Sequence, residues 1–324
     1  MHVKSCESRT ARWLRAASLL AILSAGLVSI FGSGGGMPAV DPSQCCQEPS
    51  VSVDPALRTV GVGDSVTFKA LVLFARHPVR YQWRRDGVDI AGATSASYTL
   101  TGATLGDDGA RFTVVVTAEN GTASATATLQ VSRFPPVVYR DGEFAPAEWS
   151  SESRSEPSVN GPSAVVSRVD SGGNPDAYRA IDYAMTAGPS SIVVMHTALA
   201  ATYDPQTLGP IYAIDAQIDC IDTGFGETSV APLLEQDGRR YRAWDFFGCH
   251  TFWASASAQL SLGANDFRLI DGPACAAGQA CPDFGAGGAP IRFGFATAAR
   301  VAPEMPAVSY RVGVDNWSVS VWRR

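Results

Sequence analysis

IYAIDAQIDCID, residues 211–222, alternates apolar and polar side chains along its length. A period of two is the pattern of a β-strand that buries one face and leaves the other open. One row consists of Tyr212, Ile214, Ala216, Ile218 and Cys220, and the other consists of Asp215, Gln217 and Asp219. The stretch therefore predicts a strand with a core face and a polar outer face.

Residues 137–324 contain further strand-like runs in which apolar and polar residues alternate, separated by Gly, Pro and Asp. No run has convincing helical periodicity, although LGANDFRLI at 262–270 is compatible with one helical turn. Short strands punctuated by turn residues are typical of antiparallel two-sheet folds. We therefore expect residues 137–324 to form a jelly-roll-type β-sandwich.

Residues 51–132 form a smaller set of alternating runs, with an Asn-Gly hairpin signal in ENGT at 119–122. Trp83 lies in YQWRRDGVDIAGATSASYTL, and DDGARFTVV follows at 107–115. In these motifs the segment resembles the bacterial immunoglobulin-like domains of the intermediate-set type. Val114 and Ala70 stand where that family has its two cysteines. The resemblance implies an immunoglobulin-like β-sandwich held by packing, used as a spacer, adhesion unit or display platform.

A second, looser resemblance involves DGEFAPAEW at 141–149 and VGVDNWSVSV at 312–321. These segments look like the ends of bacterial jelly-roll modules of the lectin or carbohydrate-binding type. The resemblance implies that the first and last strands lie side by side. It also implies a possible structural calcium at their junction, with Asp141, Glu143 and Asp315 as oxygen donors. No other cofactor is expected.

The net charge of the chain narrows the classes of partner that it is expected to bind. The chain has 324 residues and a formal net charge of −6, so nucleic acid and anionic membrane surfaces are disfavoured as main partners. The basic pair Arg239-Arg240 is expected to be an ordinary strand end. VGVGDS at 60–65 contains a G-x-G without a following helix, which excludes a nucleotide loop. Residues 37–50 and the proline-rich 133–136 are expected linkers.

The first 36 residues predict export. Basic positions precede an apolar run at 16–32 and a small-residue stretch, which together resemble a secretory signal peptide. An uncleaved anchor is the alternative, and it would be the chain's contact with a membrane. The remaining cysteines are even in number, as an oxidising compartment favours. We expect Cys220–Cys249 and Cys275–Cys281 disulfides, and the pairing of Cys45 and Cys46 stays open. A secreted, periplasmic or cell-surface location follows.

The candidate ligand contacts are Asp215, Gln217, Asp219, Asp245 and Trp253. Carboxylates and amides can bind sugar hydroxyls, and a flat aromatic ring can stack on a sugar ring. Two residues four apart on a strand are about 13 Å apart, farther than the two carboxyls of a glycosidase. Asp215 and Asp219 alone therefore cannot be a glycosidase pair, and a plain solvated strand face is the competing interpretation.

These observations favour an exported, non-catalytic binding or cell-surface interaction protein of the bacterial envelope, with carbohydrate or another envelope protein as its partner. The alternative is a secreted glycan hydrolase or lyase that uses Asp215, Asp219 and Asp245. A purely structural envelope spacer is the third possibility. No catalytic residue is assigned.

Overall fold

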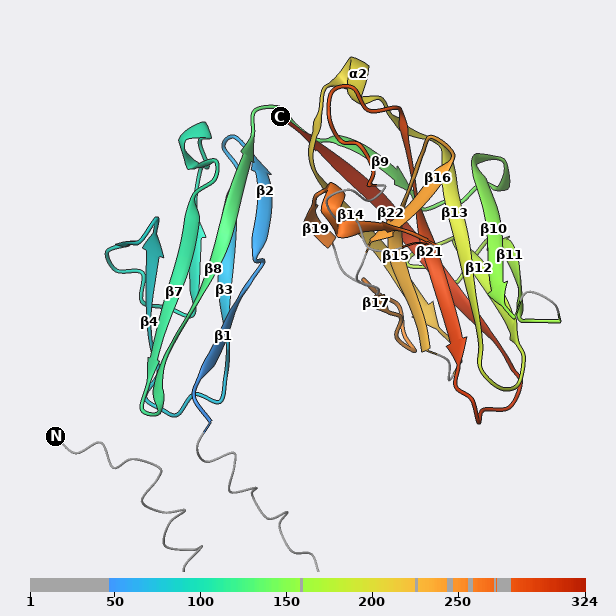
Figure 1. Ribbon diagram of the computed structural model, residues 1–324, viewed down its shortest axis with the longest axis horizontal. Coiled ribbons are helices and arrows are strands. Elements are labelled where there is room, and N and C mark those ends of the chain that lie inside the picture. The colour runs from blue at the N-terminus through green and yellow to red at the C-terminus, as the bar shows by residue number, and fades with distance from the viewer. Residues whose placement is uncertain are drawn as a thin grey trace, which may run out of the picture.

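The computed structural model describes residues 47–324 except 158–159, 225–226, 244–246, 256–258, 271 and 273–280. Residues 1–36, the predicted signal peptide, lie outside the described residues, as do Cys45, Cys46, Asp245 and Cys275. The chain forms two β-sandwiches in succession, which Figure 1 shows side by side. The all-β prediction is confirmed.

The first sandwich is immunoglobulin-like. Its strands are β1 (Ser50–Asp54), β2 (Leu57–Gly61), β3 (Val66–Leu73), β4 (Arg80–Arg85), β5 (Val88–Asp89), β6 (Ser97–Leu100), β7 (Arg111–Ala118) and β8 (Gly121–Ser132). One sheet has the order β1-β3-β6 and the other the order β2-β8-β7-β4-β5. The β2–β8 pair is parallel, and β7 and β8 form an antiparallel hairpin. Two facing sheets with this strand order are the immunoglobulin arrangement.

Packing replaces a disulfide in the core of this sandwich. Trp83 is fully buried and donates from Nε1 to the carbonyl of Ser95 at 3.0 Å. Phe68 and Phe112 are also fully buried, and their rings stack 5.0 Å apart. Val114 has no exposed surface and lies in the same cluster. Val114 thus contributes an apolar side chain to the core at one of the two positions where the sequence resemblance expected a cysteine replacement.

The second sandwich contains two larger sheets. Its strands are β9 (Val137–Asp141), β10 (Trp149–Glu156), β11 (Ser163–Val169), β12 (Tyr178–Met185), β13 (Ser190–Tyr203), β14 (Ile211–Asp222), β15 (Glu227–Gln236), β16 (Arg239–Ala243), β17 (Phe247–Gly248), β18 (Ala254–Ser255), β19 (Gln259–Leu262), β20 (Phe267–Leu269), β21 (Ile291–Val301) and β22 (Val308–Arg323). The first sheet has the order β11-β12-β22-β14-β18, with β9 and β19 attached. The second has the order β10-β13-β21-β15-β16-β20, with β17 attached. We call them the β14 sheet and the β21 sheet.

The first and last strands of the second sandwich pair with each other in antiparallel fashion. β9 pairs with β22, and Asp141 lies opposite Trp317. β22 also runs between β12 and β14, so this last strand lies in the middle of its sheet (Figure 1). The inner rows of both sheets meet in one apolar core that includes Ile214, Val319 and Phe293.

Three details differ from the sequence expectation or refine it. β10, WSSESRSE, is a strand although most of its residues are polar, because it is an edge strand paired only with β13. A short helix, α2 (Pro205–Leu208), follows β13, with Asp204 capping it through the amide of Gln206. The segment at 262–270 contains a 3₁₀ turn (Ala264–Asp266) before β20. Within the part of the chain that the structure describes, no helix is long and apolar enough to cross a membrane.

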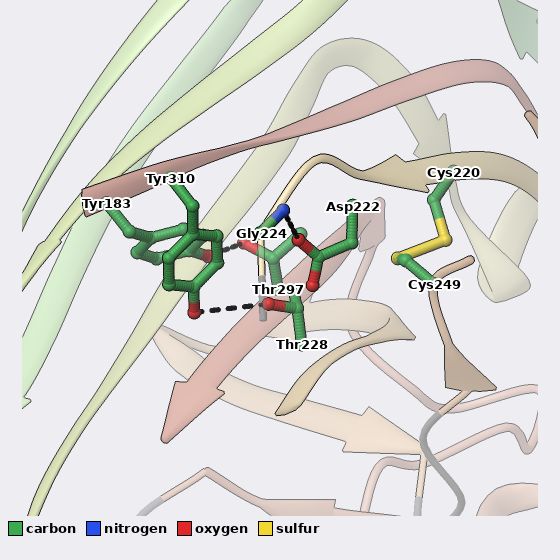
Figure 2. Close-up of a disulfide and its surroundings, with 8 residues drawn as sticks. All are labelled: Tyr183, Cys220, Asp222, Gly224, Thr228, Cys249, Thr297 and Tyr310. Carbon is green, nitrogen blue, oxygen red and sulfur yellow. Dashed lines mark hydrogen bonds between the residues drawn. A yellow bond between two sulfur atoms is a disulfide. The ribbon is translucent and has the colours of Figure 1, made fainter. Parts of the chain in front are cut away.

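The disulfide Cys220–Cys249 is present and confirms that prediction. It links the end of β14 to the segment after β17, and so connects the two sheets (Figure 2). Cys220 is buried in the core cluster, and its Cα lies 5.4 Å from that of Cys249. A disulfide of this kind fits an oxidising compartment.

Buried polar side chains lie next to this disulfide (Figure 2). Asp222 is 3% exposed and accepts a 2.8 Å hydrogen bond from the amide of Gly224. Thr228 donates to the hydroxyl of Tyr310 at 3.2 Å. Burial raises the pKa of Asp222, although the hydrogen bonds from Gly224 and Thr228 act in the opposite direction. The core of the second sandwich thus contains a carboxylate in an environment that disfavours its charge.

Candidate binding surface on the β14 sheet

Asp215 lies at the junction of the two sandwiches and is not open to a ligand. Its Oδ2 lies 3.1 Å from Nη1 of Arg58 on β2, and accepts a 2.9 Å hydrogen bond from Nε1 of Trp322. Its Oδ1 accepts from the amide of Ser261 at 2.6 Å. Burial raises the pKa of Asp215, with Arg58 opposing that shift. Strand alternation placed this side chain outside its own core correctly, but the first sandwich covers that place.

Further hydrogen bonds hold the same junction. The hydroxyl of Tyr212 donates to Oδ1 of Asp108 at 2.6 Å. The amide of Thr59 donates to Oγ of Ser261, and Thr59 is fully buried. Ser132 donates to the carbonyl of Arg323 at 2.6 Å. One end of the outer face of the β14 sheet is therefore occupied by the first sandwich, and the rest of that face is left for other contacts.

Asp219 and Asp315 lie directly opposite each other on β14 and β22, farther along that outer face. Asp219 accepts hydrogen bonds from Ser255 at 2.7 Å, Asn316 at 2.8 Å and Asn174 at 3.1 Å. Asp315 accepts from the amides of Asn174 and Asn316 at 2.5 and 2.6 Å. Burial raises the pKa of Asp315, and the neighbouring carboxylates of Asp219 and Glu143 add to the shift.

This polar network fixes the loop that precedes β12. Both acids are less than 5% exposed, whereas Asn174 is exposed and Asn316 is half-buried. The carboxylates therefore orient the two amide side chains, and the amides are the groups that solvent can reach. Asp219 lies on the outer face that the sequence predicted, but its side chain is buried and its carboxylate accepts hydrogen bonds from Asn174, Asn316 and Ser255.

An aromatic pair lies beside this network. The ring of Trp253 meets that of Tyr178 edge-to-face, with centroids 5.4 Å apart and an interplanar angle of 75°. Nε1 of Trp253 donates to the carbonyl of Gly172 at 2.9 Å. A Cβ on Gly313 would come within 2.8 Å of the Trp253 ring and within 3.0 Å of the Tyr178 ring. The absence of a side chain at Gly313 therefore lets both half-buried rings lie close to the sheet.

Charged and amide groups flank these rings. Arg311 on β22 makes a bidentate pair with Asp182 on β12, at 2.7 and 2.8 Å. Hydrogen bonds to Asp182 and Tyr178 raise the pKa of Arg311. Gln217 is exposed on the same face, between Asp215 and Asp219 on β14. We call the open part of this face, formed by Asn174, Tyr178, Gln217, Trp253, Arg311 and Asn316, the aromatic-amide surface.

The three proposed calcium donors do not form a cage. Asp141 accepts from the amides of Glu143 and Phe144 through Oδ1, and from Nε1 of Trp149 through Oδ2. Glu143 pairs with Arg168 at 3.1 Å. Among the described residues, no three His, Cys, Asp or Glu side chains converge in a way that could hold a metal ion. The carboxylates at this junction bind protein donors, so calcium there stays a prediction without structural support.

A buried cluster that sequence reasoning missed lies between the two sheets. His196 is fully buried and stacks on Phe295 with centroids 4.4 Å apart. Its Nδ1 lies 3.0 Å from Oγ of Ser151 and accepts from Nε of Arg179 at 3.1 Å. Burial lowers the pKa of His196 and the positive charge of Arg179 lowers it further. A catalytic Ser-His pair needs a group that stabilises the imidazolium, and Arg179 does the opposite.

The structure thus brings Gln217, Asp219 and Trp253 onto one face and diverts Asp215 to the junction. Asp245 lies outside the described residues. The alternation of Arg179 with Ile181 and Tyr183 in YRAIDYAM is the signal that places this arginine on an inner face.

Comparison with known proteins gives partial matches only. No family model matches the chain, and a search of the curated proteins finds no match. Crystal structures of Dscam1 isoforms 6.9 and 8.4, N-terminal four Ig domains, are 24% identical with TM-scores of 0.24. The match covers 26% of this chain, and the chain spans about a fifth (21%) of those structures. A likeness of this size carries no conclusion about fold or function, and the immunoglobulin-like topology rests on the strand order described above.

Proposed function

We propose that this protein is an exported, non-catalytic binding protein of the bacterial cell envelope, and that the aromatic-amide surface binds a neutral carbohydrate. The observation that carries the proposal is the Trp253–Tyr178 pair beside the Asn174 and Asn316 amides. A half-buried aromatic ring supplies an apolar contact for the C–H face of a sugar. The amide of Asn174 can donate to and accept from its hydroxyls, whereas Asn316 offers only its oxygen, because its two N–H groups donate to Asp219 and to the carbonyl of Asn174.

The arrangement is held in place before any ligand arrives. Asp219 and Asp315 fix the amides of Asn174 and Asn316, and Gly172 fixes the indole of Trp253. Binding then costs little side-chain ordering, which favours affinity at a small surface.

The hydrolase alternative receives less support. Asp215 is engaged with Arg58, Trp322 and Ser261, and Asp219 is engaged with two asparagines and Ser255. Neither carboxylate is presented as a free acid or base. The first sandwich, fixed at the far end of the same face, fits a role as a rigid spacer that holds the surface away from its attachment.

A glycan array probed with the full chain tests this proposal. We expect binding to one or more neutral glycans, and a loss of about tenfold or more in Trp253→Ala, since an aromatic anchor typically contributes about 2 kcal/mol. Phe74→Ala is the matched control, because Phe74 is a 51% exposed aromatic residue on the first sandwich. Equal binding by both variants would contradict the proposed surface.

A further inference from the structure

A cleft of about 370 Å³ opens on the other side of the second sandwich. Its lining includes Glu152, Arg154, Met195, Arg239, Arg240 and Ile270. β10 and β13 contribute Glu152, Arg154 and Met195, whereas the start of β16 contributes the Arg239-Arg240 pair. Glu152 lies opposite Met195 in the pairing of β10 with β13. The cleft is thus built on the outer face of the β21 sheet, away from the aromatic-amide surface.

Positive charge dominates this cleft. Among the described residues that line it, three are arginines and one is a glutamate, in a chain whose formal net charge is −6; Glu152 also lies 3.7 Å from Nε of Arg154. Arg239 and Arg154 are exposed. Arg240 is half-buried and pairs with Glu152 and with Glu235, the latter at 3.3 Å. Burial opposes the charged form of Arg240, but its hydrogen bonds with both glutamates outweigh burial and raise its pKa.

The neighbouring strands extend the positive region. Arg242 on β16 lies directly opposite Arg268 on β20. Burial and the nearby charge of Arg268 lower the pKa of Arg242 to about 10. Arg292 on β21 lies 3.4 Å from Glu235.

The floor of the cleft is apolar. Met195, Leu233 and Ala296 point away from the main core, yet each is no more than 1% exposed, and they form a small cluster of their own. Ile270 packs against this cluster and also lines the cleft. Nη1 of Arg240 lies 3.9 Å from Sδ of Met195. A ligand here would meet guanidinium groups at the rim and the carbon atoms of Ile270 beside them.

We propose that this cleft binds a carboxylate-bearing sugar unit, such as a uronic acid of an acidic polysaccharide. The guanidinium groups of Arg154, Arg239 and Arg240 take the carboxylate, and the half-buried Ile270 contacts the ring carbons. Arginine matches a planar carboxylate through paired hydrogen bonds. Glu152, whose side chain is 48% exposed, already places a carboxylate on Arg240 and so competes with the ligand. The site is on the opposite sheet, so it stands independently of the neutral-glycan proposal.

Calorimetric titration of the full chain with trigalacturonic acid tests this site. We expect binding that weakens as salt rises, and no binding of the methyl-esterified trimer or of inorganic phosphate. Arg239→Gln and Arg154→Gln should each weaken binding by about three- to tenfold, and Glu152→Gln should strengthen it by about threefold. Arg300→Gln is the matched control, because Arg300 is exposed on β21 of the same sheet, eight residues from Arg292. It should bind as the wild type does.

Several results would overturn the proposal. Absence of binding by the wild type would do so, as would equal binding of the acid and its methyl ester. If Arg300→Gln weakened binding as much as Arg239→Gln, the effect would be general electrostatics rather than a site. Weaker binding by Glu152→Gln would mean that Glu152 supports the cleft instead of competing in it. Trp253→Ala leaves this cleft intact, so it should bind trigalacturonic acid normally and separate this result from the test of the other surface.

Discussion

The guanidinium of Arg58 lies 3.1 Å from the carboxylate of Asp215, and this pair joins the first sandwich to the second. Asp215 also accepts from Trp322 and Ser261, so both of its oxygens are engaged. The side chains of Arg58 and Asp215 are only 25% and 13% exposed. A charge pair this shielded from water fixes the two sandwiches relative to each other more firmly than a surface pair would.

Asp215→Ala should destabilise the junction by about 2–4 kcal/mol, because it leaves Arg58 and two N–H groups without their acceptor. Denaturant unfolding of the full chain measures this loss. The control is Asp89→Ala, which removes an exposed pair with Arg84 and should change stability by less than about 1 kcal/mol. Equal effects of the two variants would show that the junction contributes little.

Removing the Cys220–Cys249 disulfide should cost about 3 kcal/mol, since it closes a loop whose ends are 29 residues apart. The comparison is between the wild type and the Cys220→Ala/Cys249→Ala double variant in denaturant. Under reducing conditions the gap should close. A gap that persists under reduction would assign the loss to packing of the side chains.

Asp222 predicts a pH dependence with a defined sign. Its pKa in the folded state is raised above the ordinary 3.8 by burial, so the folded state holds this proton more tightly than the unfolded state. The stabilisation of the folded state by this proton is fully present below pH 3.8 and is lost as the pH rises through the raised pKa. Relative to the wild type, Asp222→Asn should therefore become more stable as the pH increases across that window.

Denaturant midpoints measured at several pH values test this expectation. Asp176→Asn serves as the control, because it makes the same substitution at an exposed loop position. If Asp222→Asn ran parallel to the wild type, the folded state would not disfavour the charged carboxylate.

Gly313→Ala should disturb the aromatic-amide surface without removing a ring. The new Cβ would lie 2.8 Å from Trp253 and from Ile221, so the indole must shift. We expect a cost of about 1–3 kcal/mol in stability and a loss of glycan binding comparable to that of Trp253→Ala. Gly248→Ala is the control, because its Cβ meets nothing within 4 Å. Intact binding by Gly313→Ala would mean that the position of Trp253 is not important.

The alternation of apolar and polar residues along single strands is what allowed the fold class to be predicted. β14 begins and ends at the residues that the pattern of 211–222 predicts, with Ile214 and Cys220 inside and Gln217 outside. Alternation says which side of a strand a residue occupies, but it does not say what covers that side. Asp215 was therefore predicted as an open position, whereas the first sandwich lies over it.

Other features depend on tertiary contacts that no local pattern contains. β10 is polar because it is an edge strand, so it lacks the apolar row that marks an inner strand. The Arg239-Arg240 pair was expected to be an ordinary strand end. It lines a cleft because β10 and β13 place Arg154 and Met195 beside it. Such neighbours come from strand order, which is set by the whole sheet.

The most direct test of the proposed function is native affinity electrophoresis of the full chain in gels containing soluble xylan, mixed-linkage β-glucan or hydroxyethylcellulose. We expect retardation of the wild type and of Phe74→Ala in at least one of these gels. Trp253→Ala should migrate there as it does without polysaccharide. Retardation of all three proteins alike, or of none in any gel, would contradict a neutral-glycan surface centred on Trp253.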